Sequence, residues 1–238
     1  MVDEVMQKFR VVEELVKARL EVDVAGLVQG ARARLESRLA LTTLPVAAEL
    51  ADRAGPLGWG RVRTTAWEAP GFRKIVLSHV SLRPIVEGFA LVLLPAARLD
   101  APVFGADLMA LPTRVSVNAD VYGASAFSSR TAGILAPLAE TFARLGSGAG
   151  PDWARPLTAG NGLHAKVSPR VVDDAFAALT AALARYLDVT NAAEPGTSGA
   201  DAQRSFFVAF HEHGPRRGPL GTLFGGAWAE RYSRLIFE

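Results

Sequence analysis

The order of patterns along the chain predicts an α/β fold, a three-layer α/β/α sandwich with a central antiparallel sheet. Helical periodicity occupies both ends, and short strand-like runs separated by turn residues occupy residues 61–122. The gaps between these runs are too short for crossover helices, so neighbouring strands must run antiparallel. Helices before and after such a sheet are expected to cover its faces. We expect residues 1–238 to form one domain, with a helical N-terminal part over residues 1–55.

The N-terminal segment, residues 2–42, is predicted to be helical because apolar side chains recur at helical spacing, as at Leu27 and Leu35. Asp23 or Gly26 is expected to break it into two helices. Prolines and glycines then predict an irregular stretch over residues 45–58.

Five short runs follow and predict the strands of the sheet. Apolar or alternating patterns with turn residues between them are typical of strands. The runs are RVRTTAW, FRKIVLSHVSL, FALVLLP, VFGADLMAL and RVSVNADVY.

The C-terminal half returns to helical patterns. The pair Ser168-Pro169 is a favourable helix start, because a capping hydroxyl is followed by proline in the first turn. The predicted elements are a helix over 129–145, a Gly/Pro-rich loop over 146–162, a helix over 168–189, a loop over 190–202 and a last helix from Leu220 to Ile236.

Composition excludes several classes of protein. There is no cysteine, so disulfides and cysteine-ligated clusters are excluded. The near balance of 26 cationic and 24 anionic residues argues against nucleic acid as a partner. The longest apolar stretch, residues 89–97, is far shorter than the ~20 residues of a membrane helix. The N-terminus has no apolar signal core, so a cytoplasmic protein with no membrane contact is expected.

Two segments of the sequence are more informative about function than the amino-acid composition is. The block FRKIVLSHVSLRPIVEGFALVLLPAARLDAPVFGAD ends in Asp107, and the C-terminus carries FGGAWAERY followed by a short apolar tail. Together they resemble the ferredoxin-dependent bilin reductases, and among these most of all the phycocyanobilin-type pattern. The resemblance covers roughly residues 60–123 and 165–238.

This resemblance implies an oxidoreductase that reduces a linear tetrapyrrole, such as biliverdin, with electrons from reduced ferredoxin. It implies the α/β/α sandwich, a substrate between the sheet and the C-terminal helices, and a bilin radical as intermediate. It also implies that no flavin, metal or other cofactor is permanently bound. Side chains then supply the protons, which requires a buried acid that is partly protonated near neutral pH.

Asp107 is the first candidate for that acid. It matches the central aspartate of the family, and it closes an apolar, strand-like run where a carboxylate needs a partner. Asp120, near the end of the next strand, is a second catalytic candidate on the same sheet. The bland alternatives are an aspartate that faces solvent or one that caps a turn.

The chain departs from the phycocyanobilin-type pattern at two positions. Where that pattern has a glutamate and a histidine, this sequence has Ser78 and Ala90. Strand alternation places Val76 and Ser78 on one face, which would be the substrate side. We therefore expect Val76, Ser78, Ala90 and Phe104 to line a more apolar substrate site, and we favour two-electron over four-electron reduction.

The loop EHGPRRGPL holds further candidates. Gly214 stands where several bilin reductases have a second aspartate, so His213 is a substitute proton donor. Arg216 and Arg217 suit the propionates of a bilin, because the planar guanidinium can engage both oxygens of a carboxylate. Ordinary solvated charge is the alternative for these residues.

Arg73 and Lys74 are candidates for docking an acidic ferredoxin, again with solvated charge as the alternative. His211 and His213 are two positions apart, which on a strand places them on one side. No carboxylate or thiolate converges with them in the sequence, so metal binding is not expected.

Three alternative functions stay open, and one of them is unrelated to tetrapyrroles, a helical and sheet scaffold whose pocket holds another planar apolar ligand. The missing glutamate and histidine leave room for a protein that binds a bilin without reducing it. A different open-chain tetrapyrrole, such as a chlorophyll catabolite, is equally compatible with an altered site. The fragment GSGAG at residues 146–150 looks like part of a phosphate loop, but no apolar strand leads into it and proline follows at once.

Overall fold

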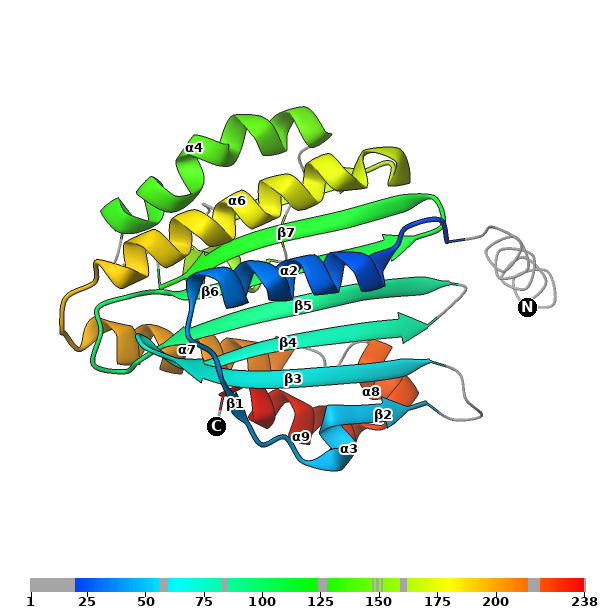
Figure 1. Cartoon of the computed structure of the whole chain (residues 1–238), viewed down its shortest axis with the longest axis horizontal. Helices are drawn as coiled ribbons and strands as arrows, with labels where there is room; N and C mark the ends of the chain where they lie inside the picture. The colour runs from blue at the N-terminus through cyan, green and yellow to red at the C-terminus, as the bar shows by residue number, and fades with distance from the viewer. Residues whose placement is uncertain are drawn as a thin grey trace.

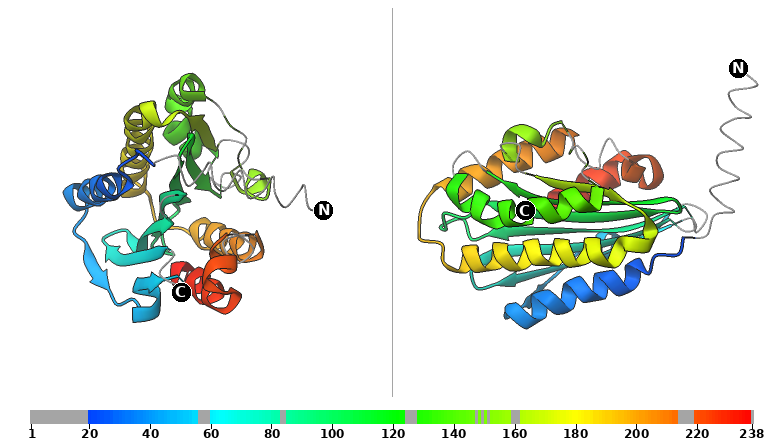
Figure 2. Two further views of the ribbon diagram at one scale, coloured as in Figure 1. Left: turned by 90° about the vertical axis from the view of Figure 1, so that its right-hand side faces the viewer. Right: turned by 90° about the horizontal axis from the view of Figure 1, so that it is seen from above.

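The sheet and its covering helices form three layers, as expected for an α/β/α sandwich with an antiparallel sheet (Figures 1 and 2). The structure is a computed structural model, and it describes residues 20–55, 60–82, 85–123, 128–146, 148, 150, 152–158, 162–213 and 219–237. No helix in these ranges is long and apolar enough to cross a membrane.

The central sheet has eight strands, and every neighbouring pair runs antiparallel. Their order is β1-β3-β4-β5-β6-β7-β8, with β2 also paired to β3. The strands are β1 (Thr42–Leu44), β2 (Asp52–Ala54), β3 (Arg61–Ala69), β4 (Phe72–Leu82), β5 (Val86–Pro95), β6 (Val103–Leu111), β7 (Arg114–Tyr122) and β8 (Leu163–Val167).

Helices cover both faces of this sheet. Figure 2 shows α2, α4 and α6 on one side, with α7, α8 and α9 on the other. Their bounds are α2 (Val24–Arg38), α3 (Ala48–Ala51), α4 (Ser128–Gly146), α5 (Arg155–Thr158), a 3₁₀ turn (Pro169–Val171), α6 (Val172–Asn191), α7 (Ser198–His213), α8 (Pro219–Phe224) and α9 (Gly226–Phe237).

The face under α2 and α6 is closed by an apolar core. Ile75, Leu91 and Phe104 from three strands are fully buried there. Tyr186 of α6 stacks on Phe104 with ring centroids 4.9 Å apart, and its hydroxyl donates to the Pro102 carbonyl at 2.8 Å. This hydrogen bond satisfies a polar group that would otherwise be costly in the core.

The opposite face carries a second apolar core under the C-terminal helices. Trp228, Tyr232 and Ile236 of α9 belong to one buried apolar cluster. Val62 of β3 and Val76 of β4 are members of the same cluster. Lys74 adds a polar tie, because its Nζ donates to the Leu235 carbonyl at 2.9 Å. The ammonium therefore sits at the end of α9, where cations complement the helix dipole.

In the N-terminal half the structure corrects the predicted boundaries. Residues 2–19 lie outside the described residues. Of the two positions expected to mark a helix boundary, Asp23 marks the start of α2, since its carboxylate accepts from the Gly26 amide at 3.0 Å, whereas Gly26 lies inside the helix. The helix ends at Arg38 rather than at residue 42, and β1, α3 and β2 occupy most of the stretch from 42 to 54 that was expected to be helix end and loop. These elements are only three or four residues long, too short for a periodicity to be visible.

In the C-terminal half three described elements were not predicted, namely α5 inside the expected loop 146–162, β8 and α7, and one predicted helix is divided. The loop expected over 146–162 is followed at once by a strand, β8, and α7 already begins at Ser198. The last helix is divided into α8 and α9 at Gly225, whose φ of 91° only glycine adopts without strain. His211 and His213 consequently lie on a helix and not on a strand.

The buried Tyr186 hydroxyl gives a test of the core. We expect Tyr186→Phe to lower the free energy of unfolding by about 1–3 kcal/mol, because the Pro102 carbonyl loses its donor inside the core. Urea denaturation followed by circular dichroism measures this. Thr180→Ala on the exposed side of α6 is the matched control, with a change within about 0.5 kcal/mol. Equal effects of the two substitutions would contradict this account of the core.

Candidate active site

One line of registered neighbours crosses the sheet from β3 to β8 on the face of the C-terminal helices. Its members, each paired with the next, are Thr64, Ser78, Ala90, Asp107, Asn118 and His164. Paired residues in an antiparallel sheet present their side chains on the same face. Strand pairing therefore brings five polar side chains, those of Thr64, Ser78, Asp107, Asn118 and His164, into one row on the same face of the sheet.

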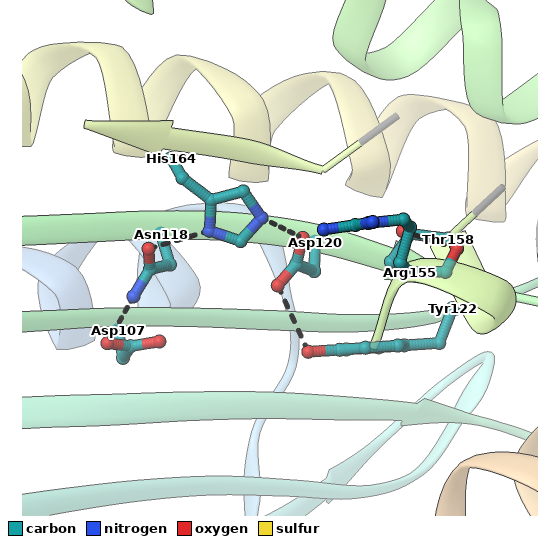
Figure 3. Close-up of polar contacts among 7 residues, drawn as sticks. All are labelled: Asp107, Asn118, Asp120, Tyr122, Arg155, Thr158 and His164. Carbon is teal, nitrogen blue, oxygen red and sulfur yellow. Dashed lines mark hydrogen bonds and ion pairs between the residues drawn. The ribbon is translucent and has the colours of Figure 1, made fainter. Parts of the chain in front are cut away.

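Asp107 is at the centre of this row, on β6. Its Oδ1 accepts a hydrogen bond from Asn118 Nδ2 at 2.9 Å, and Figure 3 shows its other oxygen directed away from Asn118. The net pKa of Asp107 is raised to about 6, mainly by burial and also by the nearby Asp120 charge, against the lowering effects of the Asn118 hydrogen bond and the His164 charge. A carboxyl group with this pKa is present in both protonation states near neutral pH.

The surroundings of Asp107 are less tightly covered than the rest of the sheet. Asp107, Asn118 and Ala90 are partly exposed, and Met109 is 44% exposed. The residues between them in sequence, such as Leu108, are buried on the other face. Around Asp107, therefore, the face of the sheet that carries the polar row is partly exposed, whereas the opposite face is buried.

His164 continues the row on β8 and makes two polar contacts. Its Nδ1 is 2.7 Å from Asn118 Oδ1, and its Nε2 is 3.1 Å from Asp120 Oδ1 (Figure 3). Asp120 is buried and accepts a further hydrogen bond from the Tyr122 hydroxyl at 3.1 Å. The result is a continuous polar chain from Tyr122 through Asp120, His164 and Asn118 to Asp107.

The surroundings of His164 act on its pKa in opposite directions. Burial lowers its pKa and is the largest single contribution, but the contact with Asp120 and the charges of Asp120 and Asp107 together outweigh it. The net result is a raised pKa. Tyr122 has its pKa raised well above the usual value, because it is buried and lies beside Asp120 and Asp107. Tyr122 is therefore a neutral hydrogen-bond donor to Asp120.

Two glycines lie directly against the His164–Asp120 pair. A Cβ atom at Gly162 would lie 2.1 Å from Asp120 Oδ1 and 2.5 Å from His164 Nε2. A Cβ at Gly150 would lie 2.2 Å from His164 Nε2. Only residues without a side chain can approach this closely, which gives a structural reason for glycine at position 150, between α4 and α5, and at position 162, directly before β8.

The other half of the row has a different character. Ser78 is buried, accepts a hydrogen bond from the Tyr232 hydroxyl at 2.6 Å and lies 3.2 Å from the Thr64 hydroxyl. Val76 is buried in the core under α9. Both were expected to line a substrate site, but α9 covers them, and only Ala90 of the three is partly exposed beside Asp107.

Two further expected site residues are displaced by the geometry. Phe104 points to the opposite face, because strand alternation separates it from Asp107, and it is fully buried against Tyr186. Lys74 is buried and bound to the end of α9, so it does not form a docking surface. Arg73 is half-buried and donates to Gln203 Oε1 at 2.7 Å, and burial lowers the pKa of its guanidinium.

His213 lies at the exposed end of α7 and not in the row. Its ring stacks on Trp153 with centroids 6.4 Å apart, and Trp153 lies parallel to Tyr122 at 6.3 Å. The expected substrate ligands Arg216 and Arg217 lie outside the described residues, as does Gly214. No group of three or more histidine or acidic side chains able to hold a metal ion is found in the described part of the chain.

Asn118 and His164 were not among the residues expected from sequence. A signal was present for both. On β7 the sequence SVNAD alternates and places Ser116, Asn118 and Asp120 on one face. LHAKV likewise alternates buried Leu163, Ala165 and Val167 with polar neighbours, which is the pattern of a half-buried strand.

Comparison with known proteins identifies a protein family and two related sequences that match this chain. The family model described as ferredoxin-dependent bilin reductase matches residues 28–238, so the likeness extends well into the N-terminal part. A phycoerythrobilin:ferredoxin oxidoreductase from Gloeobacter violaceus is 31% identical over 183 residues, covering 71% of this chain and 75% of the relative. The corresponding protein from Nostoc punctiforme is 27% identical over 220 residues, covering 84% of this chain and 86% of the relative.

A solved structure has the same fold. Phytochromobilin synthase from tomato, crystallised in complex with biliverdin, superposes with a TM-score of 0.76, covering 90% of this chain and 83% of that one at 13% identity. The family match over most of the chain, with Asp107 at the centre of a polar row on the face of the C-terminal helices, leads to one conclusion. The chain belongs to the ferredoxin-dependent bilin reductase family of enzymes.

Proposed function

We propose that the protein reduces biliverdin or a related linear tetrapyrrole by two electrons from reduced ferredoxin, with Asp107 as the proton donor. The observation that carries this proposal is the Asp107 carboxyl group, whose burial raises its pKa to about 6 on the partly exposed face of the sheet. It is supported by the biliverdin complex of the tomato protein of the same fold and by relatives named for phycoerythrobilin and ferredoxin.

The stoichiometry follows from the donor. Ferredoxin delivers single electrons, so two reduced ferredoxins and two protons are needed to add two hydrogens to one bilin. The bilin takes the first electron and a proton from the Asp107 carboxyl and becomes a neutral radical. Asp107 must then regain a proton before the second electron and second proton complete the reduction. A bilin lies against this carboxyl favourably, because its pyrrole N–H groups are donors to an ionised aspartate.

Asn118 limits how Asp107 can act. It occupies Oδ1, so Oδ2 is the oxygen that carries the transferable proton in this arrangement. The carboxyl is thereby oriented as well as partly neutralised, and a fixed orientation is a substantial part of general acid catalysis.

The preference for two electrons rests on Ser78 and Ala90. The Ser78 hydroxyl is engaged by Tyr232 and Thr64 under α9, and Ala90 has no titratable group. Neither position supplies a proton to a bilin beside Asp107. A second two-electron reduction at another part of the same tetrapyrrole would need a proton source there.

A bilin carrier is the alternative function that the same two positions favour. Mixing the purified protein with biliverdin under anaerobic conditions, and then adding ferredoxin with a system that reduces it, distinguishes the two. If the protein is a reductase, we expect the visible absorbance spectrum of protein-bound biliverdin to convert to that of a product only after reduced ferredoxin is added. A bound spectrum that stays unchanged would identify a carrier, and a chlorophyll catabolite tested in the same way covers the other substrate class.

Substitution of the acid gives the sharpest test of mechanism. We expect Asp107→Asn to bind biliverdin with little change and to lose about 10²–10⁴-fold in kcat, with the bilin radical accumulating, because the electron arrives without its proton. Stopped-flow absorbance and electron paramagnetic resonance follow the radical. Asp173→Asn, an exposed carboxylate on α6 across the sheet, is the control and should retain full activity. Full activity in Asp107→Asn would remove this residue from the mechanism.

The pH dependence has a definite sign. The protonated Asp107 is the active form, so kcat should be high below the pKa and fall as the pH rises through it, at about 6. The measurement is kcat under saturating bilin and reduced ferredoxin from pH 5 to 9. The falling limb should be absent from the residual activity of Asp107→Asn. A limb that persists there would belong to another group.

A further inference from the structure

The Tyr122 ring covers the sheet on one side of Asp107. Gly105 and Asp107 are two positions apart on β6, so both face the C-terminal helices. A Cβ atom at Gly105 would lie 2.9 Å from Tyr122 Cε2, and the buried Tyr122 ring stacks on Phe206 of α7 with centroids 4.1 Å apart. Figure 3 shows the Tyr122 hydroxyl directed along the sheet toward the side of Asp107. A ligand that lies over Asp107 therefore has no room over Gly105.

Met109 lies on the other side of Asp107 and is exposed. It is also two positions from Asp107 on β6, so it is on the same face, about 7 Å away at the usual rise of a strand. Met109 is 44% exposed, whereas its neighbour Leu108, on the opposite face, is 1% exposed. Leu111, the next residue on the face of Met109, is partly exposed. The sheet is thus open from Asp107 toward Met109 and covered in the opposite direction.

The cross-strand neighbours of Met109 are small. Its registered partners are Gly88 on β5 and Ser116 on β7, and the partner of Asp107 on β5 is Ala90. Gly88 has no side chain, and the Ser116 side chain is short and partly exposed. The two residues paired with Met109 therefore supply no large apolar side chain that would bury its thioether.

The position of Met109 distinguishes it from an ordinary exposed apolar residue. Single exposed apolar side chains are common on protein surfaces, and Val171 and Val208 are further examples in the described part of the chain. Those two belong to a 3₁₀ turn and a helix, whereas Met109 lies on the sheet beside the buried acid Asp107. Methionine is also flexible, and its polarisable sulfur makes favourable contacts with aromatic rings. Met109 therefore suits a surface that a flat, apolar ring system covers.

We propose that Met109 contacts the bound bilin and, opposite the Tyr122 ring, fixes where the conjugated system lies above Asp107. This inference rests on the proposed binding of a linear tetrapyrrole at Asp107. A pyrrole N–H group then meets the Asp107 carboxyl, and an adjoining part of the tetrapyrrole covers the Met109 thioether. The carbon that accepts the proton depends on this position, so Met109 also acts on the choice of product.

The small number of methionines allows a direct test of the contact. The sequence has three, Met1, Met6 and Met109, so protein labelled with ¹³C in the methionine methyl groups gives a simple spectrum. The nuclear magnetic resonance signal that is missing from Met109→Leu belongs to Met109. We expect this signal to shift when biliverdin is added without ferredoxin, with binding followed in the same sample by the visible spectrum. A Met109 signal that stays in place while biliverdin is bound would overturn the proposal.

The affinity for biliverdin measures the strength of this apolar contact. We expect Met109→Ala to raise the Kd about 5–30-fold, since each methylene-sized group that the ligand covers contributes about a factor of four. Met109→Leu keeps a similar apolar volume and should bind biliverdin more tightly than Met109→Ala does. Val171→Ala removes an exposed apolar side chain directly before α6, across the sheet, and is the control with unchanged Kd. Equal Kd values for Met109→Ala and the wild-type protein would contradict the contact.

The composition of the product measures the positioning. A shorter side chain lets the bilin move along β6 away from Tyr122, so we expect Met109→Ala to change the ratio of reduction products formed with reduced ferredoxin. Liquid chromatography of the extracted bilins measures this ratio. Met109→Gln keeps the length of the side chain without its apolar character, so it should bind biliverdin weakly and keep the wild-type ratio. An unchanged ratio in Met109→Ala would overturn the positioning role.

The binding measurements separate this inference from the proposed function, because they need no electrons. If the wild-type protein binds biliverdin and never reduces it, the proposed reduction fails, while the methyl signal and the Kd still decide the role of Met109. If the protein reduces biliverdin and the Met109 signal does not respond, the function stands and the inference fails. Thermal unfolding of Met109→Ala should match that of the wild-type protein, because an exposed side chain adds little to stability. A loss of affinity that only follows from unfolding would also overturn the proposal.

Discussion

The register of the antiparallel sheet is the constraint on which the whole site depends. Each strand contributes one residue to the row from Thr64 to His164, and neighbours in the row are fixed by backbone hydrogen bonds between strands. A slip of one residue in any strand would turn its side chain to the opposite face. Close packing at Gly88, where a Cβ would lie 2.5 Å from the Leu108 carbonyl oxygen, holds β5 against β6 beside Asp107. The residues of the site are therefore positioned by the strands of the sheet and their register, and not by loops.

Ala90 divides this row into two halves with different tasks. On one side, Tyr232 of α9 donates to Ser78, and this buried hydrogen bond attaches the C-terminal helix to the sheet. On the other side, Asp107, Asn118 and His164 form a chain that is partly exposed. Positions 78 and 90 hold a glutamate and a histidine in the phycocyanobilin-type pattern that the sequence resembles. In this protein a histidine is instead on β8, on the far side of Asp107, so the histidine lies at the opposite end of the same line.

The sequence predicted the parts of the fold whose patterns are long and local. The strands from β3 to β7 were expected because each contains an alternating or apolar run of seven or more residues, and Asp107 and Asp120 were placed on them by the same argument. His164 was missed because β8 has only five residues, preceded by a Gly/Pro-rich stretch and followed directly by Ser168-Pro169. Lys74 was misjudged because its burial depends on the end of α9, a contact more than a hundred residues away. Phe104 was wrongly placed at the substrate site because it is close to Asp107 in sequence. The two residues are three positions apart on β6, so strand alternation puts their side chains on opposite faces of the sheet.

The glycine-rich loop before β8 connects these observations. GSGAG looks like a phosphate loop in isolation, but Gly148 donates to the His164 carbonyl and Gly150 lies against the His164 ring. Gly148 and Gly150 therefore lie against His164, on one side of a buried histidine–aspartate pair. Burial of such a pair is costly, and an apolar pair of similar volume would serve stability as well or better. Apolar replacements would also remove the His164 partner of Asn118 and the His164 contribution that lowers the pKa of Asp107. The stability of the fold therefore does not by itself account for the buried pair.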